Sequence, residues 1–255
     1  MDDAQHAGSD DPSGRRSGTR PVQVWWARLS GAYPGLPGLL DPVERARYEA
    51  TADPLNRQQF LVGCALSRLV LGRLLGLPPA RVPLRRVCPR CGGPHGKAAL
   101  DPAADLGFSI SHSGPTVGLA VCRGAEVGLD VERLEEAPAV GLVAPRILSP
   151  AELAVLHTLV PADRPAALLR YWTRKEAVLK ALGIGLGLPP SRLEVSAPGA
   201  PARVLRWEDR PDVAGELRLT DLEAEGRHPA AVCVTGGTEP AVVEQDAHAL
   251  LTDAD

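Results

Sequence analysis

Two carboxylates two residues apart offer the first candidate chemistry in this chain. Apolar residues alternate along 127–132 (VGLDVE), so a strand there places its valines and leucine in the core and Gly128, Asp130 and Glu132 on the other face. Hard divalent cations prefer such oxygen ligands, and magnesium keeps part of its coordination for water and substrate phosphates. Gly128 would leave space for a ligand. The alternative is a solvated strand face, where acidic residues two apart are common.

A second candidate group lies on the sequence YWTRKEAVLK at 171–180, which predicts a helix that stops at a glycine-rich run. Glu176 and Lys180 are four residues apart and share a face, while Lys175 points about 100° away from Glu176. A carboxylate and an ammonium so placed could bind a metal and a phosphate together. The alternative is an ordinary surface ion pair followed by a helix cap.

The third group is FSISHSG at 108–114, where an alternating strand ends in Ser111, His112 and Ser113 before a turn. Three polar side chains at a strand end could hold a phosphate. The alternative is that His112 is a structural histidine with its hydrogen bonds satisfied.

Periodicity predicts the elements that must position these residues. The first part of the chain predicts a strand at 22–29, a long helix at 54–75 and β-like runs at 81–87, 107–111 and 116–122. After residue 124 a similar order returns: a strand at 126–132, helices at 140–147, 151–159 and 165–182, and β-like runs at 192–195, 203–207, 216–220 and 229–234. We therefore predict an α+β fold of two pseudo-symmetric halves, each a long helix packed on a small antiparallel sheet.

The predicted halves span residues 21–124 and 125–238. Residues 1–20 are polar and rich in Gly, Ser and Asp, which predicts a disordered segment. Residues 239–255 are expected to form a loose C-terminal tail.

Composition excludes several classes of function. The net charge of −3 offers no basic face for duplex nucleic acid. Neither a membrane span of about 18 apolar residues nor the apolar core of a signal peptide is visible, so we expect a cytoplasmic protein. Cys64 and Cys122 lie in apolar runs, which is typical of reduced thiols.

Together, these segments resemble the 4'-phosphopantetheinyl transferase superfamily, in its larger two-half, Sfp-type group. The family hallmarks are a Gly-x-Asp-x-Glu strand, matched at 128–132, and a Trp-Ser/Thr-x-Lys-Glu helix that closes with Gly-x-Gly, matched from Trp172. An upstream Ser-His-Ser and a Gly-Lys turn match 111–113 and 96–97. The resemblance covers about residues 22–235.

The resemblance implies an activity, its co-substrate and its partners. Such an enzyme moves the 4'-phosphopantetheine arm of coenzyme A onto a serine of an apo acyl or peptidyl carrier protein and releases adenosine 3',5'-bisphosphate. Mg²⁺ is the implied cofactor, with Mn²⁺ as a substitute. A duplicated chain can form within itself the interface that single-half relatives make between subunits, so a monomer is expected.

The resemblance also assigns roles to single residues. The implied metal ligands are Asp130, Glu132 and Glu176. The implied coenzyme A contacts are Ser111, His112 at the 3'-phosphate, Lys97, Lys175 and Lys180, with Arg57 and Arg68 as further candidates. Lys180 would steady the pyrophosphate. Glu176 is the first choice for removing the serine proton, with Glu132 and Glu152 as alternatives.

Other features keep rival interpretations open. Cys88, Cys91 and His95 have a spacing that suits zinc but lack an evident fourth ligand. They would support a zinc-knuckle module that binds RNA or protein. A carrier-protein-binding subunit without turnover is the other rival. Arg146, Arg170 and Arg174 are candidate contacts for an acidic partner surface.

Overall fold

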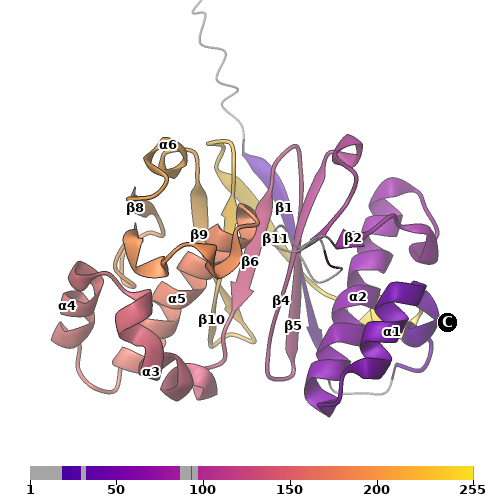
Figure 1. Ribbon diagram of the computed structural model, residues 1–255, viewed down its shortest axis with the longest axis horizontal. Coiled ribbons are helices and arrows are strands. Elements are labelled where there is room, and N and C mark those ends of the chain that lie inside the picture. The colour runs from indigo at the N-terminus through magenta and orange to yellow at the C-terminus, as the bar shows by residue number, and fades with distance from the viewer. Residues whose placement is uncertain (1–18, 30–32, 87–92, 94–96, 255) are drawn as a thin grey trace, which may run out of the picture.

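The chain stacks four layers in the order helix, sheet, sheet, helix (Figure 1). The computed structural model describes residues 19–29, 33–86, 93 and 97–254. Cys88, Cys91, His95 and the predicted N-terminal segment up to residue 18 lie outside the described residues. No described helix is long and apolar enough to cross a membrane.

The first sheet has the strand order β11-β1-β5-β4. Its strands are β1 (Arg20–Arg28), β4 (Leu106–Ser113), β5 (Thr116–Arg123) and β11 (Pro240–Asp246). The β1–β11 pair is parallel, and the other pairs are antiparallel. Helix α2 (Pro54–Leu75) covers the outer face and buries its apolar side there.

The second sheet is antiparallel, with the order β6-β10-β9. It comprises β6 (Val127–Val131), β9 (Arg218–Ala224) and β10 (His228–Val234). Helix α5 (Arg164–Ala181) covers its outer face. The inner faces of the two sheets meet in an apolar layer that includes Val24, Ala120, Leu129 and Val232. Burying that layer from both sides fixes the two sheets against each other.

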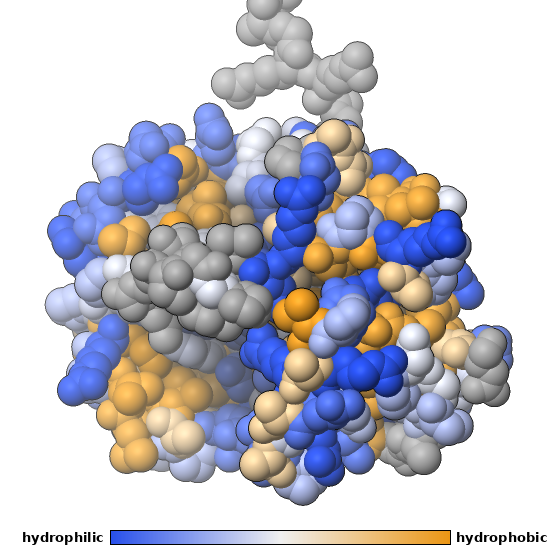
Figure 2. Space-filling view, turned by 45° about the vertical axis from the view of Figure 1, so that its right-hand side comes forward, coloured by the Kyte–Doolittle hydropathy of each residue, from blue (hydrophilic) through white to orange (hydrophobic). Residues whose placement is uncertain are grey.

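The remaining elements surround this core. They are α1 (Pro42–Ala50), β2 (Arg85–Arg86), β3 (Ala98–Ala99), α3 (Ala137–Ile147), α4 (Pro150–Thr158), β7 (Leu193–Val195), β8 (Val204–Trp207), α6 (Pro211–Ala214) and α7 (His248–Thr252). The surface between them carries hydrophobic patches among strongly hydrophilic ones, as Figure 2 shows for one face.

Capping residues explain why the long helix α2 has these bounds. The Asp53 side chain accepts the Asn56 N–H at the start, and Pro54 occupies the first turn, where no N–H partner is needed. Gly76 ends the helix with φ +66°, a conformation that favours glycine. The prediction of a helix at 54–75 is confirmed.

The mixed helix-and-sheet class is also confirmed, but the C-terminal prediction is wrong. Residues 240–246 form β11 beside β1. Leu250 and Leu251 of α7 are buried in the core under α2. The end of the chain thus completes the first sheet, so the expected boundary at residue 124 does not separate the two sheets.

The expected strand at 81–87 is reduced to β2, which follows a 3-10 turn at Pro79–Arg81. Helix α1 was not expected. Its N-cap Asp41 and Glu44 form a capping box, a signal that is present in the sequence.

Gly128 does not provide the expected space for a ligand, because the backbone of α5 occupies that space. A Cβ atom at this position would lie 1.9 Å from the Ala177 carbonyl oxygen and 2.3 Å from the Ala181 nitrogen. The missing side chain therefore lets the backbone of α5 pack directly on β6. This close approach sets the height of α5 above the carboxylates of β6.

We predict that Gly128→Ala lowers the free energy of unfolding by about 3 kcal/mol or more, because backbone atoms on both sides cannot move apart cheaply. Chemical denaturation monitored by circular dichroism measures the loss. Gly199→Ala is the control, since no atom lies within 4 Å of a Cβ placed there. Equal stability of the two variants would contradict the packing role of Gly128.

Candidate active site

Strand β4 directs its polar side chains to two different places. Successive residues of a strand point to opposite faces. Ser111 therefore faces β6, where its hydroxyl donates to Asp130, while His112 faces a pocket over α2. The expectation that Ser111, His112 and Ser113 hold one phosphate together is corrected, because the middle residue points away from its neighbours.

Asp130 is buried where β4 and β6 lie beside each other. Its Oδ1 accepts from Lys180 Nζ at 2.6 Å and from Ser111 Oγ at 3.0 Å. Its Oδ2 is buried and has no hydrogen-bond partner among the described residues. Burial raises the pKa of Asp130, and the Lys180 charge opposes that rise.

Two further carboxylates share this environment. Glu132 Oε2 accepts from Ser113 Oγ at 2.9 Å, and its Oε1 accepts from Trp172 Nε1 at 3.1 Å. Glu176 Oε1 is buried without a partner in the described part of the chain. Burial, and then the charge of Asp130, raise the pKa of both glutamates to about 7. Three carboxylates therefore lie close enough to repel one another.

The chemistry of this donor set fits a hard divalent cation. It supplies carboxylate oxygens only, two of them buried and unpaired, and a cation would relieve the mutual repulsion. In the side-chain arrangement described for 19–29, 33–86, 93 and 97–254, no three Asp, Glu, His or Cys residues are already gathered as metal ligands. One oxygen of Asp130 is instead held by Lys180.

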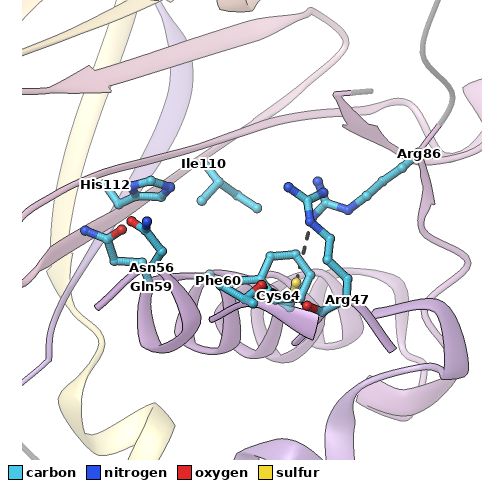
Figure 3. A pocket seen from close by; sticks show the side chains of 10 residues that line it. Arg47, Asn56, Gln59, Phe60, Cys64, Arg86, Ile110 and His112 are labelled. Atoms are coloured by element: carbon cyan, nitrogen blue, oxygen red, sulfur yellow. Dashed lines mark hydrogen bonds between the residues drawn. The ribbon is translucent and has the colours of Figure 1, made fainter. Parts of the chain in front are cut away.

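A pocket of about 420 Å³ opens on the other face of β4, against α2. Figure 3 shows the guanidinium groups of Arg47 and Arg86 on the same side of Phe60. The centroid of its ring lies 4.8 Å from Arg47 Cζ and 5.8 Å from Arg86 Cζ. Neither arginine forms an ion pair with a described carboxylate, so both charges are available to an anion. The lining residues are Arg47, Thr51, Asn56, Gln59, Phe60, Gly63, Cys64, Arg86, Ile110 and His112.

Lys180 does not line the pocket but lies close enough to His112 to affect its charge, and it also binds Asp130. Burial, and then the Lys180 charge, lower the pKa of His112. The ring is therefore neutral at neutral pH. Lys180 uses two of its three N–H donors on Ser111 and Asp130. Its third donor and its partly exposed side chain remain for a ligand that spans both places.

Comparison with known proteins identifies the family. The model of the 4'-phosphopantetheinyl transferase superfamily matches residues 126–233. The chain is 30% identical over 210 residues to the 4'-phosphopantetheinyl transferase HetI of Nostoc sp., covering 80% of this chain and 83% of that protein. The chain belongs to the 4'-phosphopantetheinyl transferase superfamily.

Other relatives carry the same description. The 4'-phosphopantetheinyl transferase AcpT of Salmonella typhimurium is 37% identical over 129 residues, which are 51% of this chain and 60% of AcpT. A phosphopantetheinyl transferase of Thraustochytrium sp. is 26% identical over 231 residues, 84% of this chain and 78% of the relative. The protein is therefore a transferase of this family.

Two residues expected at the transferase site lie elsewhere. Lys175 is completely buried and donates to Glu152 Oε2 at 2.5 Å and to the carbonyls of Ile147 and Pro190. Glu152 also accepts from the backbone of Val195. The pair ties α5 to α4 and β7, so the expected phosphate contact by Lys175 and proton removal by Glu152 are corrected.

The arginines expected on α2 are also away from the pocket lining. Arg68 is buried and pairs with Asp41 and Glu44, which anchors α1 on α2. Arg57 is half-buried in the first turn of α2 but does not line the pocket. Arg68 is therefore a structural residue and not a coenzyme A contact.

Lys97, in the predicted N-terminal half, contacts two residues of the predicted C-terminal half. Its ammonium donates to Glu126 at 3.0 Å and to the Ala181 carbonyl at 3.5 Å, near the glycine-rich end of α5. It is partly exposed. Two of its three N–H donors are thus used, and the third remains for a phosphate if Lys97 contacts coenzyme A.

Two of the three candidate docking arginines are not available to a partner. Arg174 is completely buried and binds both Asp221 oxygens, and Arg170 donates to backbone carbonyls of β9 and β10. Arg146 alone among the three is exposed.

Sequence reasoning missed Arg47, Phe60 and Arg86. Arg47 lies on α1, a helix that was not predicted, and Arg86 lies on a strand of two residues. Phe60 lies inside the predicted helix at 54–75, where an apolar side chain gives no sign of a pocket. The capping box at Asp41 was the one available signal, since it predicts α1 and thus the position of Arg47.

We predict that a Glu→Gln substitution destabilises the protein at Glu152 but not at Glu176. Glu176→Gln removes a repelling charge and loses no hydrogen bond at Oε1, so the melting temperature stays equal or rises. Glu152→Gln leaves the buried Lys175 charge uncompensated and lowers the free energy of unfolding by about 3 kcal/mol.

Thermal and chemical unfolding with a chelator present measure both effects. Equal destabilisation by the two substitutions would contradict the separation of the site from the Lys175–Glu152 pair.

Proposed function

We propose that this transferase moves the 4'-phosphopantetheine arm of coenzyme A onto a serine of an apo acyl or peptidyl carrier protein and releases adenosine 3',5'-bisphosphate. One arrangement supports this function best: a cationic pocket and a group of repelling carboxylates lie on opposite faces of β4 and share Lys180 as a neighbour. Coenzyme A has a nucleotide with a 3'-phosphate at one end and a pyrophosphate next to it, which suits two adjoining sites.

The pocket over α2 is the proposed nucleotide site. Arg47 and Arg86 offer charged donors, which form stronger hydrogen bonds to phosphate than neutral donors do. His112 lines the same pocket and, being neutral, can donate one N–H to the 3'-phosphate.

The carboxylates of Asp130, Glu132 and Glu176 are the proposed ligands of Mg²⁺, for which Mn²⁺ can substitute. Mg²⁺ bound there would neutralise charge on the pyrophosphate oxygens. Lys180 would donate its remaining N–H to the same pyrophosphate and so stabilise the charge that develops on the leaving oxygen.

The proton of the carrier serine needs an acceptor. Glu176 is our choice because its Oε1 has no hydrogen-bond partner among the described residues, whereas both oxygens of Glu132 already accept hydrogen bonds. The positioned serine oxygen then forms the new bond to the β-phosphorus as the bond to the bisphosphate breaks.

Several finer features remain predictions. These are the two-half Sfp-type subgroup, a cytoplasmic location and a monomeric state. The rival interpretation is a subunit that binds carrier proteins without turnover. Such a subunit would retain only the carrier-binding surface. The carboxylates argue against it, since unpaired buried carboxylates cost stability that a binding subunit has no need to lose.

The test is intact-mass spectrometry of an apo carrier protein incubated with the enzyme, coenzyme A and Mg²⁺. We expect a gain of about 340 Da, the size of a phosphopantetheine arm, that a chelator abolishes. Glu176→Gln should slow the gain by about 100-fold or more while remaining folded. Coenzyme A binding without any mass gain on several carriers would favour the rival without turnover.

A second prediction concerns the nucleotide pocket. The parent enzyme should bind coenzyme A more tightly than 3'-dephospho-coenzyme A, and His112→Ala or Arg86→Ala should reduce this preference by about tenfold. Isothermal titration calorimetry with the two ligands measures it. Arg57→Ala is the matched control, since Arg57 lies on the same helix as the pocket but does not line it. An unchanged preference in His112→Ala would refute the assignment of the 3'-phosphate site.

A further inference from the structure

Ser113, the last residue of β4, contacts the two residues that directly follow β6. Its side chain is buried, and its hydroxyl accepts the Arg133 backbone N–H at 3.1 Å. The hydroxyl has one proton, and the remaining short contact is to Glu132 Oε2 at 2.9 Å. Because the backbone N–H can only donate, the hydroxyl proton must point to the carboxylate.

Glu132 is thereby held from two directions. Ser113 of β4 binds one oxygen, and Trp172 of α5 binds the other. Each oxygen keeps lone-pair capacity for a further ligand. Asp130 Oδ2 and Glu176 Oε1 have no such partners within the described residues, so Glu132 is the carboxylate whose two oxygens are both restrained.

The other serines of this strand face show that the arrangement is specific. Ser109, Ser111 and Ser113 all point to the same side of β4. Ser111 binds Asp130, whereas the Ser109 side chain makes no hydrogen bond to a described residue, although it is also buried. Two of the three hydroxyls thus each bind one carboxylate, that of Asp130 in β6 or that of Glu132 just after it.

We propose that Ser113 is a positioning residue that fixes the Glu132 carboxylate for cation binding. This inference rests on the proposed function, because it assigns Glu132 to the cation site. Groups that orient a metal ligand typically contribute about 10- to 100-fold to metal affinity. Ser113 also joins β6 to β4 through the Arg133 N–H, so a purely structural role is the alternative that the experiment must separate.

The experiment measures binding of Mn²⁺ alone to the full chain by electron paramagnetic resonance. We expect Ser113→Ala to weaken Mn²⁺ binding by about tenfold, and to raise the Mg²⁺ concentration needed for half-maximal transfer by a similar factor. The rate at saturating Mg²⁺ and the affinity for coenzyme A should stay near those of the parent. Ser109→Ala is the matched control and should leave all four quantities unchanged.

The outcomes separate the two proposals. Unchanged Mn²⁺ affinity in Ser113→Ala, while the parent binds Mn²⁺ and transfers, would overturn the role of Ser113 alone. Equal loss of coenzyme A affinity and Mn²⁺ affinity would show a structural role and overturn it too. A parent that binds no Mn²⁺ would defeat the cation site itself. If the alanine variant unfolds, Ser113→Cys provides the same test, since a thiol has similar shape but is a weak donor.

Discussion

The shortage of positive charge around one buried and two half-buried carboxylates is the constraint on which the rest of this structure depends. Within the part of the chain that the structure describes, Asp130, Glu132 and Glu176 meet one ammonium, that of Lys180, and a few neutral donors. Burial without full pairing costs free energy, which must be offset by the packing of the layers around it. Two sheets with a shared apolar interior and two long helices outside supply that packing.

The position of the carboxylates follows from how β4 and β6 lie beside each other. The two strands are neighbours but share no backbone ladder. Instead, serine hydroxyls of β4 accept the backbone N–H groups of Val131 and Arg133 and donate to the Asp130 and Glu132 side chains. Since Gly128 lets α5 approach β6 closely, Glu176 and Lys180 of that helix arrive over the same strand. A bulkier residue at this one glycine would move both groups away together.

Elements whose signals lie within their own segment could be predicted from the sequence. The helix at 54–75 has an aspartate cap, a proline and a terminal glycine within its own segment, and the strand carrying Asp130 alternates regularly. Strand β11 was missed because its partner is β1, at the other end of the chain, and none of its own residues is fully buried. Pairing between distant segments leaves no trace in the composition of either one.

The same distinction explains which of the predicted site residues lie together in the structure. Asp130, Glu132, Glu176 and Lys180 come together because each faces the space between β6 and α5, and helical spacing predicts that for Glu176 and Lys180. Lys175, next to Glu176, lies about 100° around the helix, and that angle carries it to Glu152. The angle was evident from the sequence, but the element on that side of α5 was not.

The buried basic residues that hold the layers together have their charges satisfied. Arg68, Arg174 and Lys175 are each buried, and each has carboxylate and carbonyl partners that use its donors. Asp130, Glu176 and Arg86 each retain a buried polar atom with no partner among the described residues. A fold selected only for stability would remove or pair such atoms, because an unpaired buried group costs about 1–3 kcal/mol. Glu44 and Trp207 also carry such an atom away from the site, so unpaired atoms alone do not mark a ligand site. Together with the repulsion among the carboxylates, they support the proposal of an anion at Arg86 and a cation between Asp130 and Glu176.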